Sequence, residues 1–287
     1  MAYPTVDRPY GFRPVNLIGG QVFSGSTRNI PIQYNYATNI FYGDFVVISN
    51  GFVTRAAVTN ASSGNLVTGV FLGCTYTDPS TKQKRFAQNW TASTAAGDAF
   101  AIVCDDPDTV FKAVMVTTQG GTTVGSGSLA IVGKNLVASD LASSGTYANT
   151  GNSSNGILAA TTTPVTTSLP IRIIDVVRDT ATSVTATGSS SSTTITLTGS
   201  GLPSAIVSGT DVSYLASNGQ LIQTGSYVNN ASGYAAGSTS ITINAAISVP
   251  GAITAIPSAS TIVFTQYPEV LCKIQFGNHS YYTATGA

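Results

Sequence analysis

Most of the chain alternates apolar and polar residues over short runs, and glycine, asparagine, aspartate or proline bounds each run. A period of two is typical of a half-buried β-strand. Outside one charge-poor segment, strands are therefore expected at 29–36, 44–49, 51–58, 67–77, 99–105, 109–117, 170–179 and 269–276. Residues 128–142 leave two interpretations open, a short helix or two strands.

Turn residues separate these runs. Asn50-Gly51 lies between two predicted strands, and this dipeptide accepts the positive φ angles of a type I′ hairpin turn. Asp78-Pro79 and Asp106-Pro107 mark further turns. Residues 143–168 are almost wholly small and polar, which indicates a loop or a linker that follows the surface.

A charge-poor segment follows. Between Ala181 and Thr265 the only charged residue is Asp211. Two nearly identical words, STTITLT at 192–198 and STSITIN at 238–244, alternate strictly, and glycines recur about every 8–12 residues. This spacing favours a small antiparallel sandwich or barrel with an outer face of Thr, Ser and Asn. A disordered Ser/Thr linker is the other interpretation, and the regular alternation of Ile, Val and Leu opposes it.

The strands predicted at 170–179 and 269–276 flank this segment. If they pair in one sheet, residues 180–266 are a module inserted into a host domain made of 21–179 plus 267–287. The predicted fold class is therefore all-β: a β-barrel or sandwich host, an inserted small antiparallel β-sandwich that projects from it, and an extended N-terminal arm at 1–20.

Composition narrows the functional classes. The 287 residues carry 12 basic and 12 acidic side chains, a net charge of zero, and charged residues make up 8% of the chain. Neither nucleic acid nor a membrane surface is an expected partner, because binding to either one requires a basic protein surface. Nor is a transmembrane helix or a signal peptide expected from the sequence. A surface with so few charges gives little protection against association with other proteins. The composition therefore suggests a protein that belongs to an assembly.

Candidate chemistry is sparse. Cys74, Cys104 and Cys272 lie in strand-like runs and fit no disulfide or zinc spacing, so buried free thiols are expected, consistent with a reducing cytoplasm. The single histidine, His279, is interpreted as a surface residue near the end of the chain. The chain contains one glutamate, Glu269.

The densest acidic site is Asp105-Asp106-Pro107-Asp108. It lacks the spacing of a calcium loop and is interpreted as a solvated turn. The sequence contains no nucleotide-binding, zinc or hydrolase motif, so no catalytic residue, cofactor or metal is predicted and the chain is not expected to be an enzyme.

Two segments are candidate contact sites. Prolines at 4, 9 and 14 exclude a helix, so residues 1–20 are either a frayed terminus or an arm that lies on a neighbour. The second is the basic segment with Lys82, Lys84 and Arg85. It is too small for nucleic-acid affinity and is interpreted as a charged hairpin tip that reaches a partner subunit. The candidate contact residues are Tyr3, Arg8, Tyr10, Phe12, Arg13, Lys82, Lys84, Arg85, Phe86 and Trp90.

Several stretches resemble one group of proteins. They are GFRPVNLIGGQVFSGSTRNIPI, VTGVFLGCTYTDPSTKQKRFAQNW, DDPDTVFKAV, LPIRIIDVVRD and YPEVLCKIQFGNHSYYT. These stretches look like capsid decoration, or cement, proteins of podovirus-type tailed bacteriophages. The resemblance covers about 1–180 and 266–287, and the inserted module departs from it.

The resemblance implies a β-rich structural protein, made in the host cytoplasm and located on the outer capsid surface of the virion. Its implied partners are the major capsid protein and itself, as a homotrimer or similar oligomer. Such proteins bridge neighbouring capsid subunits. The alternative is a fibre-type adhesin that binds host-surface glycans through residues 180–266.

Overall fold

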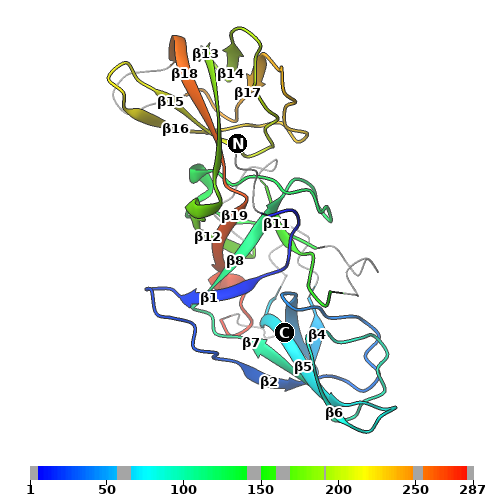
Figure 1. The fold of residues 1–287 in the computed structure, drawn as a ribbon. Coiled ribbons are helices and arrows are strands. Elements are labelled where there is room, and N and C mark those ends of the chain that lie inside the picture. Colours follow the sequence, from blue (N-terminus) through cyan, green and yellow to red (C-terminus); the bar gives the residue numbers. More distant parts are fainter. Residues whose placement is uncertain are drawn as a thin grey trace.

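A computed structural model describes residues 6–56, 66–140, 150–159, 169–190, 192–247 and 255–282 (Figure 1). The fold is all-β, as the alternation predicts, and its strands form three sheets that follow one another along the molecule. In the described ranges the helical elements are short 3-10 turns, namely η1 (Leu129–Ile131), η2 (Arg178–Thr180) and η3 (Phe276–Asn278).

The N-terminal sheet lies at one end of the molecule (Figure 1). Its strands are β2 (Arg28–Pro31), β3 (Phe45–Ser49), β4 (Phe52–Arg55), β5 (Gly69–Thr77), β6 (Lys84–Ala87) and β7 (Phe100–Cys104). The order is β2-β7-β5-β3-β4, and β6 pairs with the far end of β5. Asn50 and Gly51 join β3 to β4 with φ angles of 51° and 83°, so the predicted hairpin turn is confirmed.

The central sheet combines strands from distant parts of the sequence. They are β1 (Arg13–Leu17), β8 (Thr109–Val116), β9 (Asn135–Leu136), β10 (Ala138–Ser139), β11 (Gly156–Leu158), β12 (Ile171–Val176) and β19 (Glu269–Ile274). The order is β10-β11-β8-β19-β12-β9, and β1 also pairs with β8. The N-terminal and central sheets share one hydrophobic cluster that includes Phe12, Phe45, Phe111 and Cys272, so the host is packed around a common core.

Two sequence expectations need correction in this region, and one open alternative is resolved. Residues 13–17 were assigned to an extended arm, but they form strand β1, with a bulge between Pro14 and Asn16. Residues 156–158 were placed in a loop or linker, but they form buried strand β11. Residues 128–142 combine both interpretations, because η1 precedes two strands of two residues each.

The insert sheet lies at the opposite end of the molecule from the N-terminal sheet (Figure 1). Its strands are β13 (Thr182–Ser190), β14 (Thr194–Leu197), β15 (Asp211–Leu215), β16 (Leu221–Tyr227), β17 (Ser240–Thr242) and β18 (Ile256–Gln266). All pairs are antiparallel, in the order β16-β15-β18-β13-β14-β17. A bridge between Val228 and Ile243 brings the two edges together, so the sheet is a nearly closed barrel.

The two similar words of the insert are partners in this barrel. The first forms β14 and the second forms β17, and Ile195 lies directly opposite Ile241. Both isoleucines are fully buried, while Thr196 and Thr242 face solvent. The flanking strands β12 and β19 also pair, with Arg172 opposite Lys273. In the sequence, all strands of the insert therefore come between β12 and β19, two strands that pair with each other in the central sheet.

Candidate interaction surfaces

The described residues of the N-terminal segment are held against their own chain. Tyr10 donates a hydrogen bond to the carboxylate of Glu269, which is 2% exposed and also lies 3.2 Å from Lys112 Nζ. Burial and this neighbouring carboxylate raise the pKa of Tyr10. The guanidinium of Arg13 lies 4.1 Å from the ring centre of Tyr42, so both predicted contact residues make intrachain contacts.

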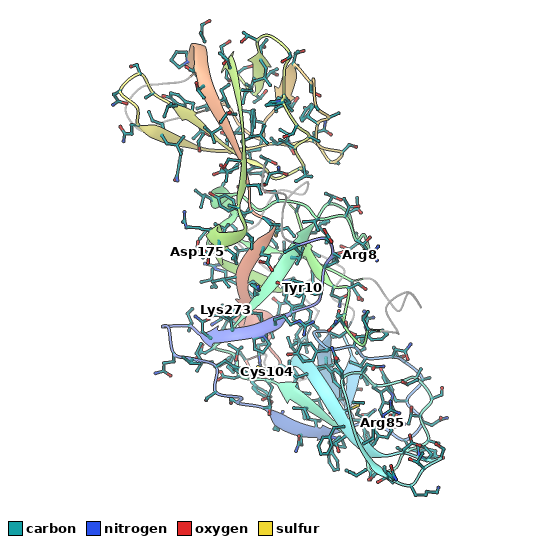
Figure 2. All side chains as sticks on the ribbon, viewed as in Figure 1. Arg8, Tyr10, Arg85, Cys104, Asp175 and Lys273 are labelled. Carbon is teal, nitrogen blue, oxygen red and sulfur yellow. The ribbon has the colours of Figure 1, made fainter. Side chains whose placement is uncertain are left out.

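Two predicted contact residues belong to the core, which corrects the expectation that they reach a neighbour. The rings of Phe12 and Trp90 are both 0% exposed. Phe12 packs against Phe45 with 4.2 Å between ring centres, and Trp90 Nε1 donates to the Tyr36 carbonyl at 3.2 Å. Arg8 is exposed (Figure 2), and Tyr3 lies outside the described residues.

The other predicted residues lie on the β5–β6 hairpin, at the end of the molecule farthest from the insert (Figure 2). Lys82 adopts a positive φ of 60° in the turn. Lys84 pairs with Asp98 at 3.1 Å, and Arg85 pairs with Asp78 at 3.6 Å. The basic charge of this tip is therefore largely balanced, and its most prominent group is an aromatic ring, Phe86, which is 78% exposed.

Phe86 is part of a larger apolar surface on the outer face of the N-terminal sheet. Thr75 of β5 lies opposite Phe86 on one side and Phe100 on the other, and Phe100 lies opposite Pro31. Residues directly opposite one another on adjacent antiparallel strands share a face. The row Pro31, Phe100, Thr75 and Phe86 is called the phenylalanine face below, and Phe100 is 40% exposed.

The sequence pointed to Phe86 but not to Phe100. A usable signal is present in the word AFAIVC, where Phe100 alternates with buried Ala101 and Val103 and so must point outward. The opposite face of the same sheet is covered by a cluster that includes Phe71 and Trp90.

A second exposed aromatic group lies near the C-terminal end of the described chain. Phe276 and Tyr282 stack with 4.0 Å between ring centres, and they are 64% and 46% exposed. Tyr281 donates to Asp105, which pairs with Arg28 at 2.7 Å. A groove of about 270 Å³ extends this surface, and its lining is Ile18, Arg172, Ile174, Lys273, Ile274, Gln275 and Phe276.

The interpretation of His279 as a surface residue is wrong. Its side chain is 0% exposed, because residues 276–282 fold back so that His279 bridges Val67. The His279 ring lies 4.9 Å from the Tyr281 ring centre, and Nδ1 accepts the Tyr281 amide at 3.3 Å. Burial lowers the pKa of His279, against the opposing effect of Asp105, so the ring is neutral at pH 7.

The remaining chemical candidates are structural in the described ranges. All three cysteines are free and buried, as predicted, and burial raises the pKa of Cys74 to about 12. In the Asp105–Asp108 turn, Asp105 pairs with Arg28 and Asp108 pairs with Lys273 at 3.2 Å. No group of three His, Cys, Asp or Glu in the described part could hold a metal ion. Nor does that part contain a helix of the length and apolar character needed to span a membrane.

The insert contributes a neutral pocket. It has a volume of about 490 Å³ and lies where β15 ends and β18 begins; its lining is Tyr214, Leu215, Ala216, Ser217, Ile222, Pro257, Ser258, Ala259, Ser260 and Thr261. Hydroxyl groups and small apolar groups share this lining, and none of its side chains is charged.

Comparison with protein-family models, with curated proteins and with solved structures finds no match to this chain.

Proposed function

We propose that the chain is a structural, partner-binding protein of a phage capsid, which binds the outside of the shell and cements neighbouring major-capsid subunits. The observation that carries the proposal is the phenylalanine face. Phe86 and Phe100 lie in one row on a face of the N-terminal sheet, and Thr75 and Pro31 complete that row without a charge. Exposed aromatic clusters of this kind mark contact sites between proteins.

The layout of the molecule supports attachment at one end. The phenylalanine face lies on the N-terminal sheet, and the insert lies at the opposite end (Figure 1). A chain attached through the N-terminal sheet would present the insert to solvent. The terminal aromatic surface, with Phe276 and Tyr282, offers a second contact, either to another capsid subunit or to another copy in a trimer.

Such a protein acts by mass action. A ligand that binds only the assembled shell stabilises it by an amount that grows with the ratio of its concentration to its dissociation constant. Many copies on one lattice act together, so each contact can be modest. No catalytic group is required for this role.

The test uses empty shells assembled from the major capsid protein of the phage to which this chain is proposed to belong. The full chain is mixed with shells, and bound protein is quantified after sedimentation. The double variant Phe86→Asp and Phe100→Asp should lose at least about tenfold in affinity, because truncation of a central aromatic contact typically costs that much or more. Val22→Ser is the matched control, since Val22 is 79% exposed but lies away from this face.

Two results would count against the proposal. Undiminished binding by the folded double variant would remove the phenylalanine face from the contact. Failure of the wild-type chain to bind shells would remove the capsid role itself. Circular dichroism of each variant confirms that the sheets are intact.

The neutral pocket favours a second candidate function, glycan binding by the insert. A pocket without charges suits a neutral ligand, and its hydroxyls can bond to a sugar. In the described part of the insert the large side chains most exposed to solvent are aliphatic, Leu215 and Leu221, so a flat aromatic platform is not available there. Binding of the full chain to a panel of neutral oligosaccharides, abolished by Ser260→Phe, would support this candidate.

A further inference from the structure

The single charge of the insert lies at its base, not on its surface. Asp211 is the first residue of β15, opposite Tyr227 of β16 and Thr265 of β18. Its side chain is 2% exposed. A buried carboxylate without a cation is costly, so its position needs a physical explanation.

Asp211 lies where the insert contacts the central sheet. The Ser126 amide donates to the Ser208 carbonyl at 3.2 Å, and the Tyr267 amide donates to Ser126 Oγ at 2.9 Å. A side chain at Gly209 would collide with the Ser126 carbonyl oxygen. Tyr227 belongs to the hydrophobic cluster of the host, although it comes from the insert. These residues, Ser126, Ser208, Gly209, Tyr227 and Tyr267, are called the junction below.

The surroundings of Asp211 favour its neutral form. Of its two oxygens, Oδ1 is buried and has no hydrogen-bond partner among the described residues. The titratable groups near it are two tyrosines, Tyr227 from β16 and Tyr267 from the β18–β19 connection. Tyr267 is also influenced by Arg178 and Asp175, which follow or end β12, but no ion pair joins either of them to Asp211 in the described part.

The direction of the titration follows from this burial. Desolvation raises the pKa of Asp211 to about 7, and a hydrogen bond from the Val212 amide opposes the shift only in part. A carboxyl whose pKa is raised in the folded state stabilises that state while it is protonated, and the stabilisation is lost as the pH rises through the folded value.

We propose that the junction is a proton-operated contact: protonated Asp211 holds the insert against the central sheet, and its ionisation loosens that contact. The insert contains no second charged residue that could pair with Asp211. The inference does not depend on the proposed capsid role.

Hydrogen exchange at the Ser126 and Tyr267 amides tests the proposal in the full chain. After correction for the intrinsic exchange rate, protection of these amides should fall about 100-fold from pH 5 to pH 9, which is the factor expected when opening returns a pKa near 7 to its ordinary value near 4. Asp211→Asn should abolish most of this pH dependence and should exceed wild type in protection at pH 9. Asp175→Asn, which removes an exposed carboxyl on β12 of the central sheet, should keep the wild-type response.

Parallel pH profiles of wild type and Asp211→Asn, or greater protection of wild type at pH 9 than at pH 5, would overturn the proposal. If Asp211→Asn does not fold, the test is an NMR titration of the Asp211 side-chain carboxyl carbon in the wild-type chain. Titration of that signal with a midpoint near 7 supports the proposal, and a midpoint below 5 overturns it.

Discussion

The host and the insert are both built from β-sheets, but they differ in how they use charge. Every charged residue except Asp211 lies outside residues 182–266. The outer face of the insert is made of hydroxyls instead. Thr185 and Thr187 are exposed on β13, and Ser183 bonds across the sheet to Thr265 with 3.1 Å between oxygens. A sheet can therefore present a polar face to water without charge, because threonine fits an exposed strand and bonds to water.

The host and the insert differ more strongly in the charged groups that they bury in their interiors. The host buries a connected ionic group, in which Arg55 contacts Asp44 at 3.2 Å and also bonds to Asp140. Asp44 accepts further hydrogen bonds from Ser153 at 2.6 Å and from Asn155 at 3.1 Å. This network ties β4 to segments about a hundred residues away. The insert, in contrast, buries one carboxyl without a cation, whereas in the host Arg55 opposes the rise that burial causes in the pKa of Asp44.

The strongest test of this contrast is removal of the central cation of the host. Arg55→Met should lower the free energy of unfolding by about 4 kcal/mol, because two buried carboxylates lose their partner. Trp90 is the only tryptophan and lies in the host, so its fluorescence in a urea titration reports this loss directly. Lys84→Met, which removes an exposed pairing partner, is the control and should leave the midpoint unchanged. A loss below about 1 kcal/mol for Arg55→Met would show that the network is not compensated as described.

The second test asks whether the two parts unfold separately. Ile241→Ala should lower the stability of the insert barrel by about 3 kcal/mol, because Ile241 is fully buried opposite Ile195 and its truncation leaves a cavity. Circular dichroism should detect an earlier transition, while the fluorescence of Trp90 keeps its wild-type midpoint. Thr242→Ala, an exposed neighbour, is the control. A matching shift of both signals would mean that insert and host unfold as one unit, coupled through Tyr227.

Much of the fold follows from local pattern. Strict alternation locates β14 and β17, and the turn preference of Asn50-Gly51 locates the β3–β4 hairpin. In these places one physical preference, either side-chain period or positive φ, decides the structure without help from distant residues. The edge strand β1 was missed because Pro14 removes a donor, and the bulge beside it restores the pairing with β8.

The candidate site was harder to predict, because surface and core favour the same side chains. Aromatic residues are preferred in interfaces and in cores alike, so Phe12, Phe86 and Trp90 cannot be separated by residue type. Only strand register shows that Phe86 faces outward beside Phe100. The burial of His279 depends on the return of residues 276–282 to Val67, a long-range contact that carries no local signal.

The smallest expected effect concerns the surface charges themselves. Arg178 lies 3.9 Å from Asp175 in a pair whose side chains are 62% and 48% exposed. Arg178→Gln should change the free energy of unfolding by less than about 0.5 kcal/mol, because solvent screens exposed ion pairs.

Ser183→Ala, which removes the hydroxyl pair with Thr265 in the insert, should have an equally small effect, also within about 0.5 kcal/mol. Equality of the two would mean that the insert loses no stability by lacking surface charge, so the charges of the host matter for solubility and contacts rather than for folding. A loss above about 1 kcal/mol for Arg178→Gln alone would instead assign the host surface a folding role that the neutral insert must replace by other means.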